Sequence, residues 1–285
     1  MNAVDPLIAP EELRDLLGDP ALRIVDCRFS LASPSSGEEA YRAGHLPGAV
    51  YLHLERDLSA PLPAPGAHGG RHPLPDPDTL AARLGKLGVG FQHRVVAYDD
   101  LGEMAARAWW VLRYLGYPDV RVLDGGFGAW TSHGLPVSDD VRRHPPVRVV
   151  PQLNADLLVT SRAEVEQAAA AGRLVDSRAG ERYRGDIEPL DLLAGHIPGA
   201  RNFSWERVKG PSGAYRPPEE LRARFGDLND AVVYCGSGVT ACPNVLALTR
   251  LGRRARLYAG SWSDWISYPD RRIATGPEHP DPEER

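Results

Sequence analysis

The sequence contains few cysteines and lacks a long apolar run. Cys27, Cys235 and Cys242 are the three cysteines among 285 residues, a sparse and odd set unlike the disulfide framework of a small secreted protein. No apolar stretch approaches the roughly 20 residues of a membrane-spanning helix, and the start resembles no secretory signal. The net charge of −5 argues against a general nucleic-acid binder, which needs a basic surface. We therefore expect a cytoplasmic protein with free thiols and with neither a membrane nor a nucleic acid as partner.

What the sequence does contain is an internal repeat. "IVDCR" (24–28) returns as "LVDSR" (174–178), and "AGHLPGAV" (43–50) returns as "AGHIPGAR" (194–201). In the same order, "RVVAYDDLG" (94–102) matches "AVVYCGSG" (231–238), and "VRVLDGGFGAW" (120–130) matches "RARLYAGSWSDW" (254–265). Four matches in one order indicate a duplicated domain. The predicted organisation is a first domain at 1–138, a proline-rich linker at 139–153, a second domain at 154–275 and a flexible tail at 276–285.

Each copy alternates between strand and helix patterns. Apolar runs ending near Asp99 and Cys235 have the length of strands buried on both faces. Helical spacing follows each run, over 103–116 and 240–252, and both helical stretches end at a glycine. The alternation predicts α/β domains, each with a central, mainly parallel sheet flanked by helices. Ligands of such sheets bind at the carboxyl ends of the strands, which is where Cys235 falls.

The loop "CGSGVT" (235–240) is suited to a reactive cysteine. A tight turn before a helix presents backbone N–H groups and the positive end of the helix dipole, which together favour a thiolate. The alternative interpretation is a buried cysteine that only ends a strand. A phosphatase is disfavoured, because its loop has an arginine six residues after the cysteine and this chain has Ala241. A dithiol centre is also disfavoured, because Cys242 is seven residues away and is expected in the core.

The paired "GH(L/I)PGA" motifs, "LDGGFGAW", "GSWSDW" and "CGSGVT" resemble the tandem-domain sulfurtransferases of the rhodanese superfamily, and "CGSGVT" is most similar to the 3-mercaptopyruvate sulfurtransferase branch. The resemblance implies a catalytic second domain and an inactive first domain, with Asp99 at the cysteine position. It implies a Cys235 persulfide that passes sulfane sulfur from 3-mercaptopyruvate to cyanide or to a thiol, such as thioredoxin or a small thiol. Neither a cofactor nor a metal is expected.

Three alternatives stay open at this point. Thiosulfate is the alternative donor. The other two are a non-catalytic binding protein of the same fold and a phosphatase or arsenate reductase on it. We expect a monomer, because two fused domains already supply an interface.

The candidate site residues follow from the loop and the resemblance. Cys235 and Ser237 are the predicted catalytic residues, and the active-site loop adds Gly236, Gly238, Val239 and Thr240. Ser237 is expected to handle a proton, whereas Thr240 is expected to cap the following helix. The resemblance implies that Arg182 and His45 bind substrate and that His45 relays protons with the loop serine. It also implies a second arginine where this chain has Leu190, a departure that weakens the case for mercaptopyruvate.

Other polar residues of the repeat are expected to be structural. Asp26 and Asp176 are expected to fix loops through backbone hydrogen bonds, and His196 to tie a loop to backbone groups. His68 and His72 flank two glycines in "HGGRH", but no third ligand is in sight, so a zinc site is not expected.

Overall fold

The computed structural model describes residues 5–62, 64 and 67–284 and divides into two compact units. The first unit comprises Met1–Ala60, Leu74–Asn154 and Pro211–Tyr215, and the second comprises Pro61–Pro73, Ala155–Gly210 and Arg216–Arg285. The main division between the units falls between Asn154 and Ala155. The expected continuous domains are not observed, because Pro61–Pro73 groups with the second unit and Pro211–Tyr215 with the first.

The first unit contains one parallel sheet with the strand order β1-β5-β4-β2-β3. Its strands are β1 (Leu7–Ile8), β2 (Leu22–Asp26), β3 (Val50–Tyr51), β4 (Arg94–Tyr98) and β5 (Val120–Leu123). Its helices are α1 (Pro10–Asp15), α2 (Ser36–Ala43), α3 (Pro77–Lys86), α4 (Glu103–Leu115) and α5 (Gly126–Ser132). The helix expected over 103–116 is α4, and its C-cap Gly116 has φ of 103°, a conformation that glycine adopts readily.

The second unit repeats this topology with the order β6-β10-β9-β7-β8, again all parallel. Its strands are β6 (Leu158–Val159), β7 (Leu174–Asp176), β8 (Arg201–Asn202), β9 (Ala231–Tyr234) and β10 (Ala255–Tyr258). Its α-helices are α6 (Arg162–Ala170), α7 (Gly180–Arg184), α8 (Pro218–Phe225), α9 (Cys242–Arg250) and α10 (Ser261–Trp265), with short 3₁₀ turns at Ala155–Leu157, Trp205–Val208 and Pro282–Glu284. The predicted duplication and α/β class are confirmed.

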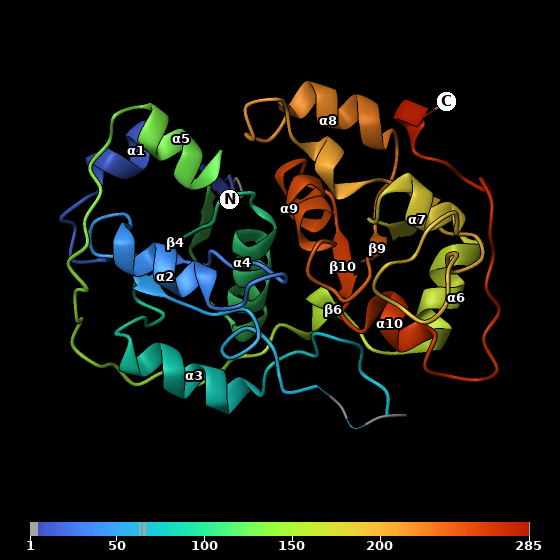
Figure 1. The fold of residues 1–285 in the computed structure, drawn as a ribbon, viewed down its shortest axis with the longest axis horizontal. Coiled ribbons are helices and arrows are strands. Elements are labelled where there is room, and N and C mark those ends of the chain that lie inside the picture. The colour runs from blue at the N-terminus through green and yellow to red at the C-terminus, as the bar shows by residue number, and fades with distance from the viewer. Residues whose placement is uncertain (1–4, 63, 65–66, 285) are drawn as a thin grey trace. The chain divides into compact units, whose positions relative to one another are not determined.

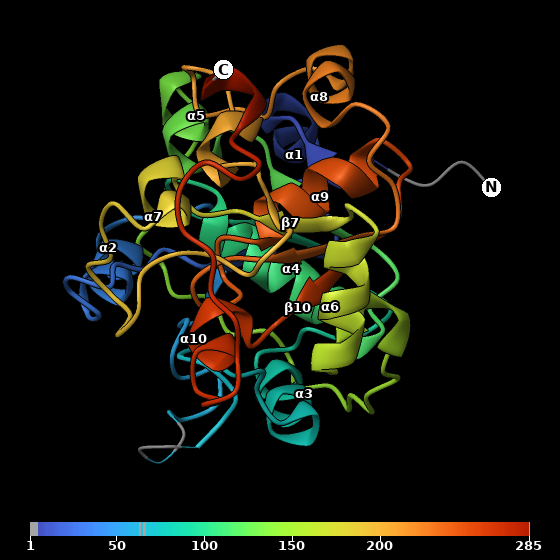
Figure 2. The same ribbon diagram turned by 90° about the vertical axis from the view of Figure 1, so that its right-hand side faces the viewer.

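Helices cover both faces of the second sheet. In Figure 1, α9 lies on one side of β9 and β10, and α6, α7 and α10 lie on the other; Figure 2 views this unit from the side of α6 and α7. Val232 and Tyr234 of β9 pack into a core with Val165, Tyr183 and Trp262 from these three helices. Because both faces are covered, β9 is apolar along its whole length.

The segment expected to be a linker, 139–153, belongs to the first unit and contains no described helix or strand. Backbone hydrogen bonds hold it there, from Val147 N–H to Gly85 O and from Gln152 N–H to Leu115 O.

The tail expected to be flexible is instead bonded to the second unit. Asp281 is fully buried and pairs with the buried Arg224 at 2.6 Å. Glu278 accepts from Gly199 N–H at 2.9 Å, and Glu284 pairs with Arg184 at 2.8 Å. Its few apolar residues suggested fraying, whereas the acidic side chains of residues 278–284 hold it in place.

No helix in the described part of the chain is long and apolar enough to cross a membrane.

Candidate active site

Cys235 follows directly after β9, at the carboxyl end of the central strand of the second sheet. Its Sγ accepts a hydrogen bond from Gly238 N–H at 3.1 Å, so the loop curls back onto the sulfur. The turn after β10 holds the other side of the loop, because Trp262 N–H donates to Cys235 O at 2.9 Å and Ser261 Oγ accepts from Cys235 N–H at 3.1 Å. Cys235 is 1% exposed, and these bonds fix the sulfur beside a backbone donor that can stabilise negative charge.

The loop geometry requires glycine at position 238. Gly238 has φ of 80°, and a Cβ there would lie 2.3 Å from Ala259 O. Val239 is buried. Helix α9 begins at Cys242, and the residue at its N-cap is Ala241, with no side-chain hydrogen bond. The expected capping by Thr240 is therefore wrong, because the helix begins one residue later than that role requires.

Ser237 lies in this loop beside a histidine that sequence reasoning did not assign to the site. Its Oγ is 2.8 Å from His72 Nδ1, and both side chains are buried. His72 comes from the Pro61–Pro73 segment, which is part of the same unit as the loop. The only available signal was the pair of histidines in "HGGRH", which were considered only as metal ligands and were not expected to bind zinc. His68 instead bonds Ser267 Oγ at 2.7 Å and stacks on Tyr268.

The structure does not bring His45 together with this loop in one unit. His45 belongs to the first unit and is fully buried, with its two ring nitrogens 2.7 Å from Tyr41 O and 3.2 Å from Asp140 O. His196, its counterpart in the repeat, has one ring nitrogen 2.7 Å from the backbone Tyr183 O and the other 3.2 Å from the carboxylate of Glu278. The structural role expected for His196 is confirmed, and the side chain bonded to the loop serine is that of His72 rather than His45.

Two guanidinium groups converge on the residue after the cysteine. A methyl group built on Gly236 would lie 2.8 Å from Arg71 Nη2 and 3.5 Å from Arg182 Nη2. Arg182, on α7, is the arginine that the sequence indicated. Arg71 precedes His72 on the Pro61–Pro73 segment and was not anticipated. Both cations therefore lie beside the residue that follows Cys235.

Two acidic residues accept from these arginines. Glu188 Oε1 is 2.6 Å from Arg182 Nη2, and Asp191 lies 3.2 Å from Arg182 Nη2 and 3.4 Å from Arg71 Nη1. The expected loop-fixing role of Asp176 is confirmed, because it accepts from Arg178 N–H at 2.9 Å and from the buried Arg178 guanidinium.

The first unit has a corresponding loop, with Asp99 after β4. Its carboxylate accepts from Met104 N–H at 2.7 Å, from Ala105 N–H at 3.0 Å and also from Gly102 N–H. Phe127 N–H donates to Asp99 O at 2.8 Å, as Trp262 N–H does to Cys235 O. The anion-binding turn is therefore retained in the first unit, but the aspartate's own carboxylate fills it.

Comparison with known proteins agrees with this geometry. The model of the rhodanese-like domain matches residues 9–133 and 161–268. The chain belongs to the rhodanese family. It is 45% identical over 282 residues to a Pseudomonas aeruginosa protein named "Probable 3-mercaptopyruvate sulfurtransferase", covering 95% of this chain and 98% of that one. It is 33% identical over 283 residues to the thiosulfate sulfurtransferase of Rattus norvegicus, covering 93% of each.

A solved structure supports the tandem rhodanese arrangement. The 3-mercaptopyruvate sulfotransferase SseA of Escherichia coli matches with a TM-score of 0.77 and 31% identity, over 91% of this chain and 100% of that one.

The other two thiols of this rhodanese lie in the core. Cys242 is fully buried, and its Sγ lies 3.4 Å from Gly238 O. Cys27 is buried in the first unit, where burial and the nearby Asp26 carboxylate raise the pKa of its thiol well above the usual range. Neither is placed to act as a nucleophile.

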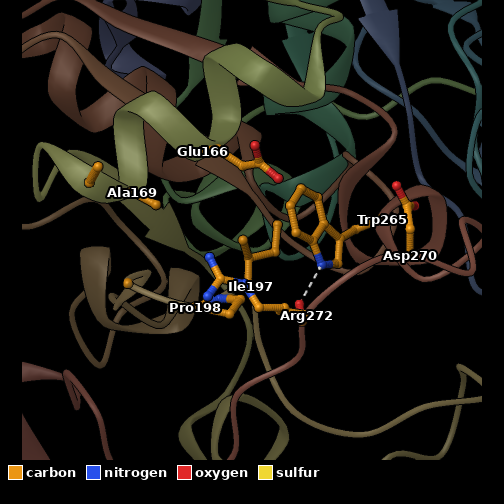
Figure 3. Close-up of a pocket in the computed structure, with 9 residues that line it drawn as sticks. Glu166, Ala169, Ile197, Pro198, Trp265, Asp270 and Arg272 are labelled. Carbon is orange, nitrogen blue, oxygen red and sulfur yellow. Dashed lines mark hydrogen bonds between the residues drawn. The ribbon is translucent and has the colours of Figure 1, made fainter.

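A cavity of about 300 Å³ in the second rhodanese unit lies between α6, the 197–199 turn and the residues around α10. Figure 3 shows Glu166, Asp270 and Arg272 around it, with Trp265 Nε1–H donating to Arg272 O at 3.2 Å. None of its lining residues belongs to the 235–240 loop.

Proposed function

We propose that this rhodanese is a sulfurtransferase that moves sulfane sulfur from 3-mercaptopyruvate to a thiol or to cyanide through a persulfide on Cys235. The observation that carries the proposal is the geometry of the loop, in which Gly238 N–H bonds the Cys235 sulfur at 3.1 Å and Ser237 pairs with His72 beside it. Relatives named as 3-mercaptopyruvate sulfurtransferases support the choice of donor.

In the first step, the Cys235 thiolate attacks the sulfur of 3-mercaptopyruvate. A bond forms between the two sulfurs while the donor's carbon–sulfur bond breaks, and its electron pair leaves on pyruvate enolate. The donor's carboxylate fits the arginines beside Gly236, which place its sulfur near Cys235. Backbone N–H groups of the loop stabilise the charge on sulfur.

The enolate must gain a proton to become pyruvate. The hydrogen bond between Ser237 Oγ and His72 Nδ1 provides a route for that proton, since a hydroxyl bonded to an imidazole can donate while the ring replaces its proton. His72 thus takes the relay role that the resemblance implied for His45.

In the second step, an acceptor attacks the outer sulfur of the Cys235 persulfide. A thiolate leaves as its own persulfide and cyanide leaves as thiocyanate; each releases the Cys235 thiolate. A small thiol or a thioredoxin-like protein dithiol is the proposed acceptor.

The proposed preference for mercaptopyruvate over thiosulfate follows from the net charge of the site. The 235–240 loop contains no cationic side chain, and Glu188 and Asp191 already offset Arg182 and Arg71. A site with little net positive charge suits the single carboxylate of mercaptopyruvate better than dianionic thiosulfate. Thiosulfate remains the second candidate, because relatives in rat and mouse bear the name thiosulfate sulfurtransferase.

The test is to compare kcat/KM for the two donors with cyanide as acceptor. We expect the value to be higher for mercaptopyruvate, and Cys235→Ser should abolish both activities. A higher value for thiosulfate would overturn the proposed donor, and activity retained in Cys235→Ser would overturn the proposed nucleophile.

A further inference from the structure

The carboxylate of Asp191 bridges the two arginines that face Gly236. Its Oδ1 is 3.4 Å from Arg71 Nη1 and its Oδ2 is 3.2 Å from Arg182 Nη2. The side chain is 3% exposed. An internal carboxylate therefore already pairs with the same two guanidinium groups that a donor's carboxylate would use, through an ion pair with Arg71 and a hydrogen bond from Arg182.

Each arginine also has an anchor that does not involve Asp191. Arg71 Nη1 donates to Leu190 O at 3.3 Å. Arg182 is bonded to Glu188 at 2.6 and 3.3 Å. Both guanidinium groups can therefore stay in place if the Asp191 carboxylate turns away or loses its charge.

Glu188 is held much more firmly than Asp191. It accepts from the backbone N–H groups of Leu190 and Asp191 at 3.1 and 3.2 Å, and it also pairs with the fully buried Arg178. Glu188 is thus a structural carboxylate.

The charges of Arg71 and Arg182 offset the cost of burying the Asp191 carboxylate only in part. Burial, and secondarily the neighbouring Glu188, raise the pKa of the Asp191 carboxyl although Arg71 and Arg182 act to lower it. Arg71 also has a hydrogen-bond donor available to a ligand, because its buried Nε has no hydrogen-bond partner among the described residues.

We infer that Asp191 is an internal competitor of the donor: the donor's anionic end binds between Arg71 and Arg182 in place of the Asp191 carboxylate. The inference rests on the proposed function and adds Arg71 as a donor-binding residue and Asp191 as a residue that sets affinity. Because Leu190 stands where the resemblance implied a second arginine, Arg71 supplies the second cation from a different segment. Competition weakens ground-state and transition-state binding equally, so it raises KM and leaves kcat unchanged.

The test is the nearly isosteric substitution Asp191→Asn, which removes the charge. With mercaptopyruvate we expect KM to fall on the order of tenfold at constant kcat, the scale of one charge-assisted hydrogen bond. Arg71→Gln, at a side chain that is 28% exposed, should raise KM by a similar factor. Asp186→Asn is the matched control, because Asp186 is an exposed carboxylate that pairs with Arg184, and it should leave KM unchanged.

A second readout separates this inference from the proposed function. Pyruvate carries the donor's carboxylate but no sulfur, so its dissociation constant, followed by NMR titration of the Cys235→Ser protein, needs no turnover. Adding Asp191→Asn should tighten pyruvate binding on the order of tenfold, and adding Arg71→Gln should weaken it. Unchanged or weaker pyruvate binding with Asp191→Asn would overturn the inference even if sulfur transfer occurs. Tighter pyruvate binding with Asp191→Asn, together with no persulfide formed by the wild-type protein, would support the inference and refute the proposed function.

Discussion

At the scale of single residues, proton transfer is proposed to depend on Ser237 and His72, and sulfur transfer on Cys235. The two steps can therefore be tested with different substitutions. The 2.8 Å hydrogen bond between Ser237 and His72 lies beside the Cys235 loop, but neither side chain bonds the sulfur in the described structure. We predict that His72→Ala lowers kcat with mercaptopyruvate by about 10²–10⁴-fold, the usual size of a general acid–base contribution. The measurement is kcat as a function of pH, whose dependence on the ionisation of the imidazole should disappear with that side chain.

His45→Asn is the informative comparison for that substitution. His45 bonds two backbone carbonyls within the first unit, so we expect lower thermal stability and unchanged kcat per folded molecule. If His45→Asn removed the pH dependence and His72→Ala did not, the relay would belong to His45.

The sequence revealed Cys235 and the loop glycines because their signal is local: a strand, a turn and a helix start within a dozen residues. His72 and Arg71 gave no such signal. His72 is 165 positions from Ser237, and only the folded chain brings a glycine- and proline-rich segment to the loop. Long-range pairs of this kind are not predictable from a single sequence, whose local pattern reports only neighbours along the chain.

At the scale of elements, the turn and helix that follow β4 and those that follow β9 present backbone N–H groups in the same way. Helix α4 and the turn before it still offer several N–H groups to an anion, and Asp99 supplies that anion permanently. The sequence predicted both helices to within two residues at each end, because apolar periodicity and terminal glycines mark them.

The C-terminal segment is the part of the chain for which the prediction from composition, a flexible tail, is wrong. Pairing with Arg224 lowers the pKa of the Asp281 carboxyl, although burial alone would raise it. A folded-state pKa below the unfolded value, which is near 4 for an aspartate, means that the carboxylate stabilises the fold above about pH 4 and that this contribution is lost as the pH falls through the folded pKa.

We therefore predict that Asp281→Asn lowers the free energy of unfolding by about 1–3 kcal/mol at pH 7, because it removes the fully buried charged partner of Arg224 and leaves the partly exposed Glu283 paired with it. Urea denaturation at pH 7 and at pH 3 measures the effect, and the difference from wild type should shrink at the lower pH. A difference of the same size at both pH values would show that the carboxylate's charge is not responsible.

At the scale of the whole molecule, duplication explains why the fold contains two sheets of the same topology. The two sheets have the same strand order, yet only the second unit has a cysteine after its central strand. Four repeated motifs were enough to predict two α/β units and their order. They could not predict that Pro61–Pro73 groups with the second unit and carries His72 there, because the second copy has no equivalent insertion to compare.

Under the proposed function, Cys235 and no other residue carries the transferred sulfur. Intact-mass spectrometry of the purified protein after brief treatment with 3-mercaptopyruvate, with no acceptor present, tests it most directly. We predict a gain of the mass of one sulfur atom, removed by cyanide or a small thiol and absent from Cys235→Ser, while Cys242→Ser gains sulfur as the wild type does. A full gain in Cys235→Ser, or none in the wild type with an active donor, would contradict the account.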